Sequence, residues 1–237
     1  MCEEEQSEHV GTQNDNINDF ALSSANSGLG EIHCLTIVGQ IEGHQVLHDS
    51  AKTTKYEHIM PLIAAIEESA EVKALLVLLN TVGGDVEAGL GIAELIAGMK
   101  KPTASIVLGG SHSIGVPLSV SAKRSFIAAS AAMTIHPVRM NGIVIAVPQS
   151  FNYFNRMQER VVGFVVTHSG ISREKYTEYM MCTSELANDI GSIIDAQEAV
   201  DCGLADEIGT LSDALKYLHE EIRRSEDIQQ LAPHGEE

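Results

Sequence analysis

The chain has 237 residues, a formal net charge of −18, 44% hydrophobic residues, 4% aromatic residues and no Trp. A chain of this length can bury a core of its own without disulfides or metals, so one domain with tails is the simplest expectation. The acidic charge and the scarcity of aromatic rings argue against nucleic-acid binding, which needs phosphate pairing and base stacking.

The cysteine pattern and the N-terminus indicate the setting of the protein. Cys2, Cys34, Cys182 and Cys202 lie far apart, with no C-x-x-C pair and no metal-ligand spacing, so we expect free thiols, no metal and no cofactor. The first residues lack the basic and apolar regions of a secretory signal, and no apolar run is long enough to span a bilayer. These features predict a cytoplasmic protein without a membrane span.

Composition divides the chain into three parts. Residues 1–29 are polar and acidic and predict a disordered tail, because they hold too few apolar groups to offset the entropy of ordering. Residues 30–224 carry the apolar patterning of one domain, and residues 225–237 are expected to form a flexible C-terminal tail.

Strand and helix patterns alternate in the first half of the domain. The run CLTIVGQIE predicts a buried strand, and YEHIMPLIAAIEESA predicts a helix whose apolar face holds Ile59, Leu62, Ile63 and Ile66. A second strand, KALLVLLN, is expected to break at residues 81–84 before a helix over residues 86–99. The pattern repeats with a strand at TASIVLGG and one further strand, from SFIAAS to AAMTI, that ends at His136. Such alternation predicts an α/β layered fold of repeated strand-helix units.

The second half of the domain is mostly helical. Residues 149–169 and 172–181 predict two helices that extend from the core, and residues 196–204 predict a short helix ended by Gly203. The run ADEIG predicts a short strand, and residues 211–224 predict a closing amphipathic helix.

Small-residue clusters follow three consecutive strands and suggest nucleophilic chemistry. They are Gly83-Gly84, the segment GGSHSIG around Ser113, and Ile135-His136-Pro137. A serine that starts a helix can attack a carbonyl, paired glycines let a backbone N–H approach the oxyanion, and a histidine can take the serine proton. Each cluster alone is more typical of a turn or a hydrogen-bonded core group.

Taken together, these segments resemble a known family. LNTVGGDVEAG, LGGSHSIGV, MTIHPV and AQEAVDCGLADEIG occur in the order and approximate spacing of the ClpP serine peptidases of the ClpP/crotonase superfamily, over residues 32–217. Within that family the segments TIHPVRMNG, VPQSFNYFNRMQERVVGFVVTHSGIS and DIG are most similar to the translocation-enhancing (TepA) branch. The resemblance implies a ClpP/crotonase-like fold with a helical handle at about residues 149–181.

The resemblance also implies site residues. Ser113 corresponds to the family nucleophile and His136 to its general base, while Gly84 and Ile114 correspond to the backbone N–H donors of the oxyanion hole. Three departures stand nearby: Thr81-Val82 for Ser-Pro, His112-Ser113-Ile114 for Ala-Ser-Met, and Pro137 directly after the histidine. Thr81-Val82 keeps the turn if the two glycines carry its unusual dihedral angles.

The third member of the triad stays open between two carboxylates. Ungapped counting from the AQEA segment reaches Gly191, whereas two inserted residues bring Asp189 to the family position, and Asp195 competes with it. We favour Asp189, because its DIG context resembles the same segment of the TepA branch. Ser111 is an alternative nucleophile and His112 an alternative base, both less favoured, and His168 is interpreted as structural.

Three classes of function remain. The favoured one is a ClpP-type serine endopeptidase that cleaves unfolded polypeptide through an acyl-enzyme inside an oligomeric chamber, with a link to preprotein translocation. A catalytically weak or silent translocation-associated scaffold is the alternative, and a crotonase-type acyl-CoA enzyme is the third. By resemblance the partners are copies of the chain in a heptameric or tetradecameric ring, a polypeptide substrate, and an ATPase unfoldase or the translocation machinery.

Overall fold

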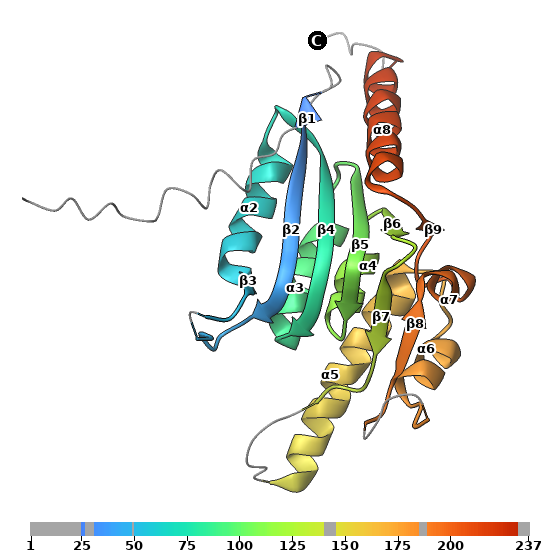
Figure 1. Cartoon of the computed structure of the whole chain (residues 1–237). Coiled ribbons are helices and arrows are strands. Elements are labelled where there is room, and N and C mark those ends of the chain that lie inside the picture. Colours follow the sequence, from blue (N-terminus) through green and yellow to red (C-terminus); the bar gives the residue numbers. More distant parts are fainter. Residues whose placement is uncertain (1–24, 27–30, 49, 140–145, 185–188, 232–237) are drawn as a thin grey trace, which may run out of the picture.

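The computed structural model describes residues 25–26, 31–48, 50–139, 146–184 and 189–231 (Figure 1). Most of the predicted disordered tail and residues 232–237 lie outside the described residues. Within the predicted tail, Ala25–Asn26 form a short strand, β1, that pairs antiparallel with the start of β2. In the described part of the chain no helix is both long and apolar enough to cross a membrane.

One sheet organises the molecule, and most of its strands are parallel. The strand order is β1-β2-β4-β5-β6-β9, with β3 beside β2 and with β7 joining β5 to β8. Only the β1–β2 and β7–β8 pairings are antiparallel among the described strands. The remaining bounds are β2 Glu31–Glu42, β3 Thr53–Lys55, β4 Val72–Gly84, β5 Thr103–His112, β6 Arg124–Ile127, β7 Ala132–Ile135, β8 Ser192–Asp195 and β9 Glu207–Ile208.

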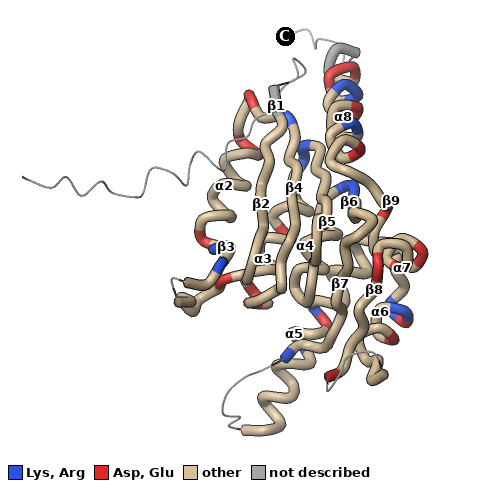
Figure 2. Tube along the Cα trace, in the orientation of Figure 1, with Lys and Arg blue, Asp and Glu red and all other residues tan. Residues whose placement is uncertain are grey.

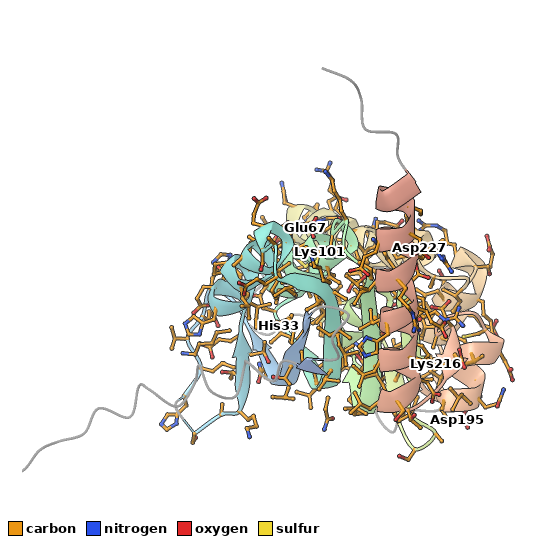
Figure 3. All side chains as sticks on the ribbon, turned by 90° about the horizontal axis from the view of Figure 1, so that it is seen from above. His33, Glu67, Lys101, Asp195, Lys216 and Asp227 are labelled. Carbon is orange, nitrogen blue, oxygen red and sulfur yellow. The ribbon has the colours of Figure 1, made fainter. Side chains whose placement is uncertain are left out.

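Helices cover both faces of the sheet, as expected when strands are apolar on both sides. On one face α2, α3 and α4 pack over the larger hydrophobic cluster, whereas α8 covers the other face with a smaller cluster (Figures 1 and 3). The predicted α/β layered fold is therefore confirmed. The helices are α2 Tyr56–Glu68, α3 Val86–Ala97, α4 Gly115–Val120, α5 Val147–His168, α6 Arg173–Met180, α7 Ala196–Asp201 and α8 Leu211–Leu231.

Strand β5 has two different neighbours on the same side. Its residues Ala104–Val107 pair with β6, and its residues Gly110–His112 pair with β7. The single strand predicted before His136 is therefore wrong. A tight turn separates β6 from β7, since the Ala131 N–H donates to the Ala128 carbonyl oxygen at 2.9 Å. The small residues of this segment fit a turn as well as a strand, so the apolar pattern alone did not reveal it.

Strand β4 and helix α8 both extend beyond their predicted ends. The break expected at Thr81 does not occur, because β4 continues to Gly84 and pairs with β2 through a register shift near Gly39. Helix α8 ends at Leu231 rather than at Arg224, so the start of the predicted flexible tail is helical. The sequence of its last turns, SEDIQQL, is mostly polar, which is why composition resembled that of a tail.

The end of α2 is stabilised from outside the helix. This helix has no basic residue in its last turn, and the Lys101 ammonium donates to the carbonyl oxygens of Ile66 and Ser69, the latter at 2.6 Å. Lys101 lies beside Glu67 in the view from above (Figure 3). A cation at this end offsets the partial negative charge of the helix carboxyl terminus.

The two helices after β7 project from the core. In Figure 1, α5 extends below the sheet, with α6 returning beside β8. Helix α5 begins at Val147, close to the predicted start of the handle, and the Ser172 hydroxyl caps α6 by accepting from the Lys175 N–H at 3.1 Å. Figure 2 shows that the projecting end of α5 carries no charged residue.

The attachment of α8 can be tested with two substitutions on the same helix. Leu218 is fully buried in the smaller cluster, whereas Ile228 is 62% exposed. We expect Leu218→Ala to lower the free energy of unfolding by about 2–5 kcal/mol, because it leaves a cavity between α8 and the sheet. Ile228→Ala should change it by less than about 0.5 kcal/mol. Urea denaturation followed by circular dichroism measures both, and equal losses would contradict the packing described here.

Candidate active site

Three parallel strands bring the predicted site residues to one edge of the sheet. Thr81 of β4 lies opposite Ser111 of β5, and His112 of β5 lies opposite Thr134 of β7. The carboxyl ends of parallel strands share an edge, so the Gly83-Gly84 turn, Ser113 and His136 follow one another along it. The structure thus gathers the three predicted clusters in the expected order.

Ser113 has a strained backbone. Its φ is 59°, and among the described residues Ala146 is the other non-glycine residue with positive φ. This conformation costs about 1–2 kcal/mol for a residue with a Cβ atom. The neighbours hold it in place, because the Ser113 N–H donates to the Thr134 carbonyl at 2.8 Å and the Ser113 carbonyl accepts from the Val116 N–H at 3.0 Å. Ser113 is therefore fixed between β7 and the start of α4.

The glycine turn of β4 packs directly against Ser113. A Cβ atom on Gly83 would lie 2.6 Å from the His112 carbonyl oxygen and 2.7 Å from Ser113 Cβ. Gly83 and Gly84 have φ of 87° and 153°, so the two glycines do carry the unusual dihedral angles that the sequence required of them. Only residues without a side chain allow this approach.

Thr81 secures the same turn. Its hydroxyl donates to the Gly39 carbonyl at 2.6 Å and accepts from the Gly83 N–H at 3.1 Å. Gly84 in turn lies against β2, where a Cβ would be 2.2 Å from the Ile41 carbonyl oxygen. The replacement of Ser-Pro by Thr81-Val82 therefore keeps a rigid turn. In this turn the Gly83 N–H is hydrogen-bonded to Thr81, and the Gly84 N–H, the predicted oxyanion donor, follows it along the chain.

His136 follows β7 and is half-buried. Its Nδ1 lies 2.7 Å from the Pro137 carbonyl oxygen. Burial holds the pKa of His136 below its ordinary value; the Pro137 hydrogen bond and Asp189 oppose this shift, and Arg139 adds to it. The ring is therefore neutral at pH 7, and because a carbonyl only accepts, Nδ1 carries the proton and Nε2 the lone pair. That tautomer is the one a general base needs.

The predicted triad acid is engaged elsewhere in this conformation. Asp189 forms an ion pair with Arg139 at 2.6 Å, and its other carboxylate oxygen accepts the Ile190 N–H at 2.8 Å. No hydrogen bond joins His136 to Asp189 or to Ser113, all of which the structure describes. The structure thus brings Ser113 and His136 to one edge but holds Asp189 beside Arg139.

Gly191, rather than a carboxylate, packs beside His136. The β7–β8 register pairs Ile135 with Ser192, and one step further along it Gly191 lies opposite His136. A Cβ on Gly191 would be 2.8 Å from His136 Cβ. Asp195 pairs with Ala132, at the other end of β7, where it forms a capping box with Glu198 at the start of α7. Its position and its capping role argue against a part in the triad.

The other polar side chains near Ser113 have structural partners. Ser111 is fully buried and donates to the Gly115 carbonyl at 2.6 Å. The Nδ1 of His112 lies 2.8 Å from the Thr134 hydroxyl. His168 contacts the Phe164 carbonyl at 2.9 Å and stacks on the Phe164 ring. The Ser111 hydroxyl is therefore buried and engaged with the backbone, while His112 is held against β7 and His168 against its own helix.

Sequence reasoning missed Arg139 and the cavity beside it. The one available signal for Arg139 was its position three residues after His136, which placed a cation near the predicted base. Nothing in the sequence indicated that Arg139 pairs with Asp189. A cavity of about 510 Å³ extends from Gly84 to Arg139, between the segment after β2, the start of α3 and the aromatic residues of α5. Among the described residues no cluster of side chains could hold a metal ion.

Comparisons with known proteins agree with this architecture. The Clp protease family model matches residues 30–212. The chain is 55% identical over 205 residues to the translocation-enhancing protein TepA of Halalkalibacterium halodurans, covering 86% of this chain and 78% of the relative. A ClpP1 mutant from Listeria monocytogenes has a similar fold, with a TM-score of 0.60 and 20% identity over 77% of this chain and 94% of that one. The chain therefore belongs to the Clp protease family.

The contact between Gly83 and Ser113 predicts a large difference between two glycines. Gly83→Ala should lower the free energy of unfolding by about 1–3 kcal/mol, because positive φ and contact with Ser113 both oppose a side chain. Gly91→Ala in α3, where a Cβ meets nothing within 4 Å, should raise it by about 0.5–1 kcal/mol through helix propensity. Urea denaturation of both variants is the test, and a harmless Gly83→Ala would contradict the geometry of the turn.

Proposed function

We propose that this protein is a serine endopeptidase, with Ser113 as nucleophile and His136 as general base. The observation that carries the proposal is the strained Ser113 backbone at the carboxyl end of β5, held against the Gly83 turn. Strain of this kind persists only where the surroundings enforce it, and it concentrates at functional sites. The Clp protease family supports the same reaction class.

The proposed reaction has two halves, acylation and deacylation, and His136 moves a proton in both. His136 Nε2 takes the Ser113 hydroxyl proton as the oxygen attacks the peptide carbonyl, and the Gly84 and Ile114 N–H groups stabilise the oxyanion. His136 then returns the proton to the leaving amine, which leaves an acyl-enzyme ester. Water, deprotonated by His136, cleaves that ester and restores the Ser113 hydroxyl. The neutral His136 with its free Nε2 supports this role.

Asp189 is proposed as the acid of the triad. A carboxylate on Nδ1 fixes the tautomer and stabilises the imidazolium that forms during attack. Asp189 is close enough to His136 to raise the pKa of the ring, although Arg139 binds it in this conformation. Formation of the triad then requires the Asp189 carboxylate to leave Arg139 and accept the hydrogen bond of the His136 Nδ1–H.

Assembly through α5 and α6 is proposed next. The projecting end of α5 is uncharged, and Val147, Phe151 and Tyr153 are each more than half exposed. Exposed apolar side chains on one segment are typical of a surface that another subunit covers. Copies of the chain are the partners we propose, in a ring or double ring whose chamber encloses Ser113. An ATPase unfoldase or the preprotein translocation machinery would supply the polypeptide, in the cytoplasm.

The biological setting rests on the TepA relative. That relative is named a translocation-enhancing protein, and 55% identity over most of both chains supports a role in preprotein translocation for this chain. A catalytically weak or silent scaffold in the same process is the second candidate. The observation that favours it is that His136 and Asp189, which the structure both describes, are not hydrogen-bonded to each other: His136 binds Pro137 and Asp189 binds Arg139.

Active-site labelling distinguishes a peptidase from a scaffold. A fluorophosphonate probe should form an adduct on Ser113 in the wild-type protein but not in Ser113→Ala or His136→Ala, because the adduct needs an activated hydroxyl. Ser111→Ala is the matched control and should label like wild type, since its buried hydroxyl faces Gly115. Intact-mass analysis reads the result. Absence of any adduct between about pH 7 and pH 9 would favour the scaffold.

Two amide substitutions identify the acid. Asp189→Asn should slow labelling by about tenfold or more, because an amide stabilises neither the required tautomer nor the imidazolium. Asp195→Asn should keep the wild-type rate, since asparagine also serves as an N-cap. Labelling time courses compare the two variants, and a slow Asp195→Asn beside a normal Asp189→Asn would reverse the assignment.

A further inference from the structure

Two groups compete for the Asp189 carboxylate. Arg139 holds one oxygen at 2.6 Å and the Ile190 N–H holds the other at 2.8 Å, while the His136 Nδ1–H donates to Pro137 instead. Asp189 is two residues upstream of Gly191, whose backbone packs on His136, so the carboxylate is tethered near the ring. Asp189 thus lies near enough to raise the pKa of His136, and in this conformation its carboxylate pairs with Arg139 instead of the ring.

The ion pair between Arg139 and Asp189 is weak enough for either residue to change partners. Arg139 and Asp189 are 50% and 43% exposed, and exposed pairs of this kind are weak because water and salt screen them. The Pro137 carbonyl meanwhile keeps the His136 ring in the tautomer that catalysis needs. The His136 Nδ1–H can therefore change its hydrogen-bond acceptor from the Pro137 carbonyl to the Asp189 carboxylate while the ring keeps the same tautomer.

From these contacts we infer that Arg139 is a positioning residue that controls the triad. With Arg139 on Asp189, His136 works with the Pro137 carbonyl as a weak base. With Arg139 drawn away, Asp189 takes over Nδ1 and the triad closes. Arg139 also lines the cavity that reaches Gly84, so a polypeptide in that cavity touches the residue that holds the acid. This inference rests on the peptidase function proposed above.

The charges around His136 fix the direction of the expected effect. His112 from β5, Arg139 from the segment after β7, and Asp189 before β8 are the groups that interact electrostatically with the ring. His136 lowers the pKa of His112, whose own pKa burial already lowers, so His112 stays neutral near pH 7. Arg139 lowers the pKa of His136 and Asp189 raises it. Removing Arg139 therefore raises the pKa of His136 on both counts.

The test compares Arg139→Gln with Arg139→Lys, Arg124→Gln and the double variant Arg139→Gln/Asp189→Asn. Arg139→Gln should speed fluorophosphonate labelling about two- to fivefold, the gain expected from breaking a weak exposed pair, and should move the midpoint of the pH–rate profile upward. Arg139→Lys, which keeps the charge, should stay near wild type. Arg124→Gln breaks a comparable ion pair with Glu207, far along the sheet, and should change nothing. In the double variant the gain should vanish.

A second readout does not depend on activity. In the full chain carrying Ser113→Ala, the pKa of His136 measured by NMR should rise when Arg139→Gln is added and stay constant when Arg124→Gln is added. If wild type labels but Arg139→Gln labels no faster and leaves the pKa of His136 unchanged, Arg139 has no such role while the peptidase proposal stands. If no protein labels, the peptidase proposal fails, and an unchanged pKa in the titration would overturn the Arg139 inference separately.

Discussion

The site depends on one constraint, the double pairing of strand β5. Its first half holds β6 and its second half holds β7, so β7 ends one residue beyond the end of β5 on the same edge. That arrangement lets the Ser113 N–H reach the Thr134 carbonyl and sets His136 two residues further on. A single continuous neighbour in place of β6 and β7 would carry His136 past the serine. The short turn at Ala128–Ala131 is therefore as important to the site as any charged residue.

Much of this arrangement follows from the sequence, and the reasons for the failures are physical. Continuous apolar runs and helical faces of period 3.6 identify most strands and helices, because the sheet is buried on both faces and each helix on one. The β6–β7 turn was missed because Ala and Ser fit turns and strands alike. The extension of β4 to Gly84 was missed because two glycines normally end a strand, whereas here the Thr81 hydroxyl and the close approach of β2 hold them in the ladder.

The site shows the same contrast between local and long-range information. Ser113, Ile114, Gly84 and His136 sit in short segments that resemble the motifs of the ClpP serine peptidases, so the resemblance identifies them as candidates, although each cluster alone is typical of a turn or core group. The proposed acid is harder to identify, because an aspartate near a helix start can serve as a helix cap as well as a triad member, and Asp195 is such a cap. Which carboxylate lies near His136 depends on the β7–β8 register, and Arg139 becomes relevant only because the chain before β8 runs past it.

These features make the proposed nucleophile rigid and the proposed acid adjustable. Ser113 is fixed by two backbone hydrogen bonds, by the Gly83 turn and by Ile114, which is buried against Gly89. Its strain of about 1–2 kcal/mol is offset by this packing, so the serine cannot relax without loss of core contacts. Asp189, by contrast, is half exposed and held by a surface arginine. Under the function proposed above, a small change in electrostatics at Arg139 would alter His136 while Ser113, Gly84 and Ile114 stay in place. For the proposed peptidase, such a division would keep the centre preorganised while its activity depends on what enters the cavity beside it.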